Sequence, residues 1–248
     1  MDVIIFSGQS NMQGSSGQLG ESVAENCFEY KYLTDEFVCV KDPVGENIGE
    51  ALLRASANGG GSLVPAFCKA YSKKKGSVVA IHCAKGGTTI SEWGNETERY
   101  KALVEKAKRG IARTQENFGL GKVFFVWLQG ESDAVMKNTE QGYLTALRSL
   151  KDSLKKDLNI DKFCIIKVGY FAEYAPWQKT ANKEDDRVIM RAQERATEEE
   201  DFIVLTDICA KLSVKQKYLN PKENGPHYNN KGLNIIGKKA GKTLAEIK

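Results

Sequence analysis

The segment Val3-Ile4-Ile5-Phe6-Ser7-Gly8-Gln9-Ser10-Asn11-Met12 joins a short apolar run to a polar turn that contains a glycine. Four further apolar runs, at residues 78–82, 123–128, 163–168 and 202–206, are rich in β-branched and aromatic residues. They do not alternate strictly with polar residues, which is typical of strands covered on both faces. The sequence therefore predicts five buried strands.

Between these runs, apolar residues recur at helical spacing in residues 100–118, 139–158, 185–200 and 232–247. Strands that alternate with helices indicate a parallel sheet with helices on both faces. We therefore expect one α/β domain over residues 1–248, a three-layer α/β/α sandwich with a five-stranded parallel sheet. Residues 14–62 have a weaker pattern, and we expect long loops there over one edge of the sheet.

The composition indicates an ordinary globular enzyme. The chain has 36 basic and 32 acidic residues, a net charge of +4, and its basic residues are spread over many short stretches. This pattern predicts no nucleic-acid partner. The six cysteines match no zinc or redox spacing and are expected to be small core residues. With no basic leader and no apolar run of about 18 residues, we expect no membrane partner and a cytoplasmic protein.

Polar segments follow three of the predicted strands. Ser10 follows the first strand, residues 84–90 follow the second, and residues 129–133 follow the third. Ligand sites of open parallel sheets lie beyond the carboxyl ends of the strands. We therefore expect these segments to meet at one edge of the sheet, within reach of His227, which precedes the last predicted helix.

The chain has only two histidines, His82 and His227. His82 lies inside an apolar run and is expected to be a core residue, whereas His227 lies among polar and turn-forming residues. A serine hydroxyl becomes a good nucleophile when a histidine accepts its proton. The pattern favours His227 as a base, whereas a serine directly after a strand is, taken alone, more typical of a helix cap than of a nucleophile.

Four blocks of sequence carry a family resemblance. They are Gly8-Gln9-Ser10-Asn11-Met12, then Lys85-Gly86-Gly87-Thr88-Thr89-Ile90 with Trp93, then Trp127-Leu128-Gln129-Gly130-Glu131-Ser132-Asp133, then His227-Tyr228-Asn229. In this order they resemble the blocks of SGNH hydrolases. Within that superfamily the chain is similar to the sialate O-acetylesterase and acetyl xylan esterase branch, including carbohydrate esterase family 6.

The resemblance implies a flavodoxin-like sandwich that removes O-acetyl groups from a small acetylated carbohydrate through an acetyl-enzyme, without a metal or other cofactor. Ser10 would be the nucleophile and His227 the base. The oxyanion donors would be the Ser10 N–H, the N–H of Gly86 or Gly87, and the side-chain amide of Gln129.

The third member of the triad departs from the usual pattern. Many SGNH hydrolases have an aspartate three residues before the histidine, and Asn224 stands at that position. An asparagine cannot supply the charge that stabilises an imidazolium. Glu131 is the first candidate to orient His227, and Glu223 is the second.

The substrate is less well indicated. Gln9, Asn11 and Trp93 are candidate substrate contacts. Trp93, Trp177, Tyr170 and Tyr174 are candidates for a wall that stacks on a sugar, and simple packing is an equal alternative. A general short-chain carboxylesterase and an inactive carbohydrate-binding relative are the alternative functions. The sequence indicates neither the sugar nor the oligomeric state.

Overall fold

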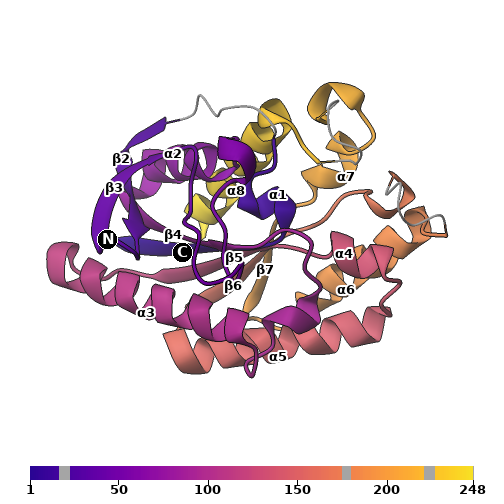
Figure 1. Ribbon diagram of the computed structural model, residues 1–248, viewed down its shortest axis with the longest axis horizontal. Helices are drawn as coiled ribbons and strands as arrows, with labels where there is room; N and C mark the ends of the chain where they lie inside the picture. Colours follow the sequence, from indigo (N-terminus) through magenta and orange to yellow (C-terminus); the bar gives the residue numbers. More distant parts are fainter. Residues whose placement is uncertain (17–22, 175–179, 221–226, 248) are drawn as a thin grey trace.

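The computed structural model describes residues 1–16, 23–174, 180–220 and 227–247 (Figure 1). The strands in these ranges are β1 Asp2–Gly8, β2 Val23–Lys31, β3 Glu36–Lys41, β4 Val78–Ala84, β5 Val123–Leu128, β6 Lys162–Ile166 and β7 Phe202–Thr206. The α-helices are α1 Ser10–Gln13, α2 Val64–Lys75, α3 Glu98–Phe118, α4 Glu131–Val135, α5 Glu140–Leu158, α6 Lys183–Ala196, α7 Ile208–Leu212 and α8 Asn230–Glu246.

The described strands form one sheet in the order β3-β2-β4-β1-β5-β6-β7. All neighbours pair in parallel except β2 and β3, which are antiparallel. Helices α2 and α8 cover one face, and α3 and α5 cover the other (Figure 1). The α/β/α sandwich expected from the sequence is therefore confirmed.

The number of strands was predicted wrongly, because the described sheet has seven strands instead of five. The two additional strands, β2 and β3, form a hairpin within residues 14–62, where loops were expected. Strand β2 includes the buried carboxylate of Glu29, and its register with β3 shifts between Ala24 and Phe28. Polar, irregular strands such as β2 and the edge strand β3 lack the continuous apolar run that reveals a central strand.

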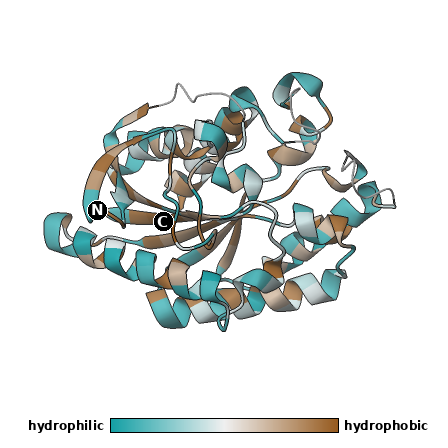
Figure 2. Ribbon diagram, viewed as in Figure 1, coloured by the Kyte–Doolittle hydropathy of each residue, from teal (hydrophilic) through white to brown (hydrophobic). Residues whose placement is uncertain are grey.

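Helix α2 also has no counterpart among the predicted helices. It packs on strands β2, β3 and β4 and also against α8, so residues on more than one side of it are buried. A helix with two buried sides shows weak apolar periodicity. The remaining long helices show apolar faces toward the sheet and polar faces outward, as the colours of Figure 2 show.

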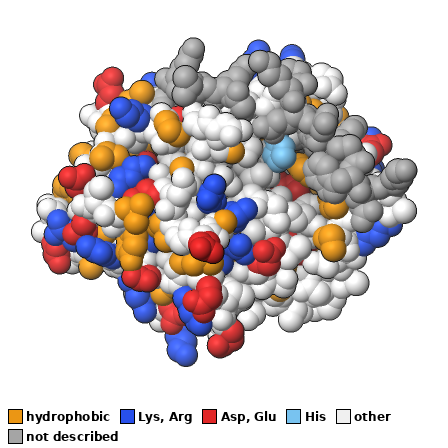
Figure 3. Space-filling model, in the orientation of Figure 1, with side chains coloured by type: hydrophobic (Ala, Val, Ile, Leu, Met, Phe, Trp, Pro, Cys, Tyr) orange, Lys and Arg blue, Asp and Glu red, His pale blue; other side chains and the backbone are white. Residues whose placement is uncertain are grey.

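The surface shown in Figure 3 carries basic and acidic side chains interspersed, in keeping with the scattered charges of the sequence. Within the described ranges, no helix is both long enough and apolar enough to cross a lipid bilayer.

Glycines allow α8 to approach α2 closely. A Cβ added to Gly237 would lie 2.2 Å from the Leu63 carbonyl oxygen, and one added to Gly241 would lie 2.3 Å from that of Phe67. Both distances are far below van der Waals contact. The position of α8 matters for function because the helix begins three residues after His227.

We expect Gly241→Ala to lower the free energy of unfolding by about 1–3 kcal/mol, because the added methyl overpacks a backbone contact. Intrinsic helix propensity alone predicts the opposite sign, a gain of about 1 kcal/mol. Urea unfolding measures the difference. Gly94→Ala is the matched control, since its added Cβ would lie 3.5 Å from the nearest atom. A Gly241→Ala variant more stable than wild type would contradict this account of the helix contact.

Candidate active site

The site lies where the central strands β4, β1 and β5 end side by side. Gly8 closes β1 with a φ of +142°, and a Cβ on it would lie 2.0 Å from the Leu128 carbonyl oxygen at the end of β5. The Gln9 N–H then donates to this same oxygen at 3.0 Å, and the Lys85 N–H donates to Gly8 O at 3.0 Å. The three segments expected to meet at this edge are thus joined by their backbones.

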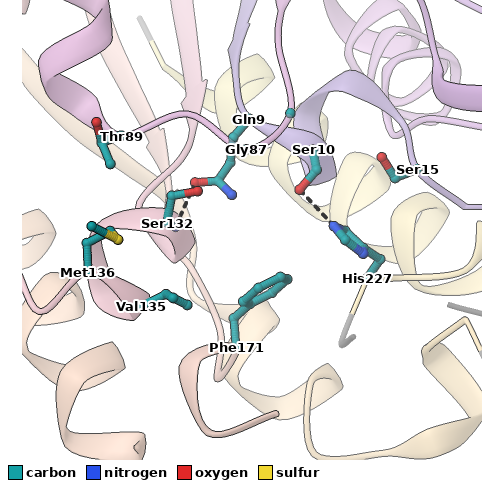
Figure 4. A pocket seen from close by; sticks show the side chains of 11 residues that line it. Gln9, Ser10, Ser15, Gly87, Thr89, Ser132, Val135, Met136, Phe171 and His227 are labelled. Atoms are coloured by element: carbon teal, nitrogen blue, oxygen red, sulfur yellow. Dashed lines mark hydrogen bonds between the residues drawn. The ribbon is translucent and has the colours of Figure 1, made fainter. Parts of the chain in front are cut away.

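Ser10 and His227 are in direct contact although 217 positions separate them. His227 Nε2 lies 2.9 Å from Ser10 Oγ (Figure 4). Burial lowers the pKa of His227 below its usual value of 6.5. The imidazole is therefore neutral near pH 7, which is the form that can accept the serine proton.

The backbone around His227 is also held. The His227 carbonyl accepts a hydrogen bond from the Asn220 N–H at 2.8 Å. On the other side of the same peptide group, the Tyr228 N–H donates to Asn11 Oδ1 at 3.2 Å. The Phe171 ring lies edge-on to the imidazole, with 5.3 Å between ring centroids. These contacts restrict both the position and the tilt of the imidazole.

The two glycines after β4 have different surroundings. The Gly86 N–H donates to Gln13 Oε1 at 2.7 Å, so it is occupied within the protein. Gly87 has a φ of +72°, lines the cavity, and has open space where a Cβ would lie. Of the two glycines expected to serve the oxyanion, the geometry favours Gly87. Gly86 instead allows close approach, since a Cβ there would lie 3.3 Å from Ser10 Cβ.

Gln129 lies elsewhere than the resemblance implied. Its side chain is fully buried, and its Nε2 donates to the Thr88 carbonyl at 2.8 Å and to Asp133. Its Oε1 accepts from the Tyr143 hydroxyl at 3.2 Å. With both ends of the amide engaged in the core, Gln129 does not present a donor beside Ser10.

Gln9 presents its side-chain amide to the cavity instead. Gln9 Oε1 accepts from the Ser132 N–H at 3.0 Å and from the Gly130 N–H at 3.3 Å. These two donors fix the orientation of the amide, so its NH₂ group is the end left for a ligand. Figure 4 shows the Gln9 side chain between Ser132 and Ser10, and Gln129 Nε2 supports it from behind at 3.3 Å.

A cavity of about 550 Å³ opens over Ser10 and His227. Val135, Met136 and Phe171 give it an apolar wall opposite the polar groups (Figure 4). The remaining lining residues are Gln9, Ser15, Gly86, Gly87, Thr89 and Ser132. The apolar wall was not found from the sequence, because nothing in short segments such as Ala134–Met136 distinguishes a cavity wall from a helix end.

Of the aromatic residues expected to stack on a sugar, Trp93 and Tyr170 are not among the described residues that line this cavity. Trp93 is fully buried, packs edge-on against Trp127, and donates from Nε1 to Thr88 Oγ1 at 3.0 Å. The Tyr170 ring faces Lys183 and Arg187. Trp177 and the side chain of Tyr174 lie outside the described residues, as do Glu223 and Asn224.

Residues 1–246 match the family described as "Carbohydrate esterase, sialic acid-specific acetylesterase". The chain belongs to this family. A curated Arabidopsis thaliana protein described as a "Probable carbohydrate esterase" is 32% identical over 91 residues. That match covers 36% of this chain and only 32% of the relative.

Several solved structures share the fold of this family member. A protein from Arabidopsis thaliana aligns over 100% of this chain and 99% of its own, with a TM-score of 0.70 and 18% identity. A lipase/acylhydrolase from Enterococcus faecalis aligns over 98% and 95%, with a TM-score of 0.54 and 12% identity. A carbohydrate acetylesterase from Xanthomonas citri aligns over 96% and 55%, with a TM-score of 0.53 and 15% identity. At such identities the likeness concerns the fold alone, and it confirms the fold expected from the four sequence blocks.

Glu131, the first candidate to orient His227, is arranged differently from what we expected. Glu131 is 2% exposed, and its Oε1 accepts from Asn11 Nδ2 at 2.8 Å. Its Oε2 has no hydrogen-bond partner among the described residues. Among the described residues, no hydrogen bond therefore joins Glu131 to the His227 ring, and Asn11 links the carboxylate to the histidine loop by hydrogen bonds.

Burial raises the pKa of Glu131 to about 7, and the neighbouring carboxylates of Asp186 and Asp133 add to the increase. A carboxyl whose pKa is higher in the folded state stabilises the fold fully below its unfolded pKa, near 4.5. That contribution is lost as the pH rises to about 7.

We therefore expect Glu131→Gln to flatten the pH dependence of stability between pH 4.5 and about 7, because the variant has no carboxyl at this position to ionise. Urea unfolding at several pH values measures this. Glu98→Gln, at an exposed position on α3, is the control and should follow the wild-type curve. An unchanged slope in Glu131→Gln would show that the buried carboxyl does not titrate in this range.

Proposed function

We propose that this chain is a serine esterase that removes O-acetyl groups from a carbohydrate through an acetyl-enzyme intermediate. The observation that carries the proposal is the 2.9 Å contact between Ser10 Oγ and His227 Nε2 at the base of an open cavity. A neutral imidazole within hydrogen-bond distance of a serine hydroxyl is the arrangement that nucleophilic catalysis by serine requires. Membership of a carbohydrate esterase family supports the class of substrate.

In the first half of the reaction, Ser10 Oγ attacks the acetyl carbonyl carbon while its proton passes to His227 Nε2. The tetrahedral intermediate then collapses, and the bond between the carbonyl carbon and the sugar oxygen breaks. His227 returns the proton to the departing sugar oxygen. Ser10 is left as an acetyl ester, and the sugar leaves with a free hydroxyl.

In the second half, a water molecule attacks the acetyl carbon and gives a proton to His227. The ester bond to Ser10 breaks, the serine oxygen takes that proton back, and acetic acid leaves. The lowered pKa of His227 suits both halves, because the base is regenerated in its neutral form at neutral pH.

Three donors are assigned to the oxyanion that forms in each half. Ser10 is the first residue of α1, so its N–H has no acceptor in a preceding helical turn. The Gly87 N–H lies at the cavity, and the Gln9 NH₂ group adjoins the nucleophile. Neutral donors fixed by the protein stabilise charge that develops in the transition state at little reorganisation cost.

A general short-chain carboxylesterase is the second candidate, and the apolar wall favours it. Val135, Met136 and Phe171 offer an acyl chain longer than acetyl a surface to bury. The two candidates share the catalytic groups and differ in the acyl group that is accepted. Rates on acetyl and butyryl esters of one alcohol separate them, since a strong preference for acetyl supports the deacetylase.

We expect Ser10→Ala to abolish hydrolysis of p-nitrophenyl acetate and release of acetate from acetylated sugars, because no covalent intermediate can form. Ser91→Ala, in a short turn that does not line the cavity, is the control. Wild-type rates in Ser10→Ala would refute the serine mechanism. If the wild-type protein hydrolysed neither p-nitrophenyl acetate nor the acetylated sugars, the result would favour an inactive carbohydrate-binding protein.

We expect Gln9→Glu to lower kcat by about 10²–10³-fold, with a much smaller effect on KM, because the loss falls on the transition state. The substitution keeps the oxygen that accepts from Ser132 and Gly130 and replaces the donor with an anion. Steady-state kinetics on p-nitrophenyl acetate measure the effect, with Gln141→Glu on the exposed face of α5 as the control. If kcat were unchanged, Gln9 would not be an oxyanion donor.

A further inference from the structure

One buried amide links the nucleophile to the histidine loop. Asn11, directly after Ser10, is 2% exposed and has hydrogen bonds at both ends of its side chain. Its Nδ2 donates to Glu131 Oε1 at 2.8 Å, and its Oδ1 accepts from the Tyr228 N–H at 3.2 Å. The chain separates Asn11 from these partners by 120 and 217 residues.

The bond to Tyr228 acts on His227 because the two residues share a peptide group. The carbonyl of this group accepts from the Asn220 N–H, and its N–H donates to Asn11. With both sides bonded, the peptide plane is fixed, and with it the Cα from which the His227 side chain projects. Loss of the Asn11 contact would release one side of that plane.

The direction of the Asn11 amide depends on Glu131. An amide can present either oxygen or NH₂ in nearly the same shape, whereas an ionised carboxylate can only accept hydrogen bonds. Above its pKa of about 7, Glu131 therefore requires the NH₂ end of Asn11, which turns the Asn11 oxygen toward the Tyr228 N–H. In the reverse orientation, two donors would face each other at Tyr228 and two acceptors at Glu131.

The surroundings of Glu131 favour this role over a direct one. Among the described residues, Asn11 is the side chain that donates to its carboxylate, beside the backbone N–H of Glu131 itself, and its second side-chain oxygen is buried without a partner. Burying a carboxylate is costly unless it is compensated. The presence of a buried carboxylate beside Asn11 is explained if the direction of the Asn11–Glu131 hydrogen bond matters for the site.

We propose that Glu131 and Asn11 are a positioning pair, in which the carboxylate fixes the direction of the amide and the amide fixes the backbone of His227 against Ser10. This inference rests on the proposed serine mechanism. Glu131 is then a positioning residue that acts through Asn11, and Asn11 is a structural link rather than a substrate contact.

The test exchanges the two functional groups. In Glu131→Gln, the side chain at 131 can present either end, so residue 131 no longer fixes the direction of the Asn11 amide, which then depends on the Tyr228 N–H alone. In Asn11→Asp, two carboxylates face each other. In the double variant Asn11→Asp/Glu131→Gln, the acid at 11 accepts from both the Gln NH₂ at 131 and the Tyr228 N–H. The double variant therefore restores the bond to Tyr228 and keeps the net charge of the wild type.

We expect each single variant to lower kcat on p-nitrophenyl acetate by about tenfold to a hundredfold, since small displacements of a catalytic group have effects of this size. KM should change little. The double variant should recover to within about tenfold of wild type, a strongly non-additive result for residues in contact. Thermal unfolding of all four proteins ensures that kcat is compared only for folded protein.

Two outcomes would overturn the inference: wild-type kcat in both single variants, or a double variant no more active than Glu131→Gln. If Asn11→Asp alone does not fold, the comparison of Glu131→Gln with the double variant still decides. Ser10→Ala, measured beside them, separates this inference from the proposed function. Activity retained in Ser10→Ala would refute the serine mechanism itself, whereas an inactive Ser10→Ala with unaffected single variants would refute only the positioning pair.

Discussion

The absence of a side chain at Gly8 allows the end of β1 to lie against the end of β5. A methyl group there would meet the Leu128 carbonyl oxygen at 2.0 Å, and the φ of +142° is also one that residues with a side chain rarely adopt. Because the backbone turns at this contact, Gln9, Ser10 and Asn11 each point in a different functional direction. Gln9 faces the start of α4, Ser10 faces His227, and Asn11 contacts both Glu131 and the histidine loop.

Neutral side-chain amides hold several of the loops and side chains of this site in place. Gln13 receives the Gly86 N–H at Oε1 and donates from Nε2 to the Ala55 carbonyl at 2.7 Å, which anchors the loop after β4. Gln129 supports Gln9 from the core. Amides offer a donor and an acceptor without charge, so several of them can be buried together at lower cost than ionised groups. The buried carboxylates of Glu131, Asp133 and Asp186 are exceptions, and burial raises the pKa of all three.

The family match and the geometry contribute different information. Residues 1–246 belong to a carbohydrate esterase family, which indicates esters of carbohydrates as the class of substrate. The structural neighbours at 12–18% identity share the fold and do not indicate the substrate. Under the proposed function, Val135, Met136 and Phe171 would select among acyl groups, and their contact with the cavity depends on the packing of α4 and of the loop after β6.

The sequence by itself determined the central strands and the sandwich, because continuous apolar runs are local signals. The resemblance of four blocks to SGNH hydrolases and the scarcity of histidines predicted Ser10 and His227 as the pair that the structure brings into contact. Only the tertiary structure decided which neighbouring groups work with them. Gly86 is occupied by Gln13, which is 73 residues away, and Gln129 is held by Thr88 and Asp133. Hydrogen-bond partners of this kind depend on how loops from different strands pack against one another. The spacing of residues along the chain does not indicate that packing. The hairpin of β2 and β3 was not predicted for a related reason, since the buried polar group Glu29 of β2 is satisfied by partners that the sequence of the strand does not reveal.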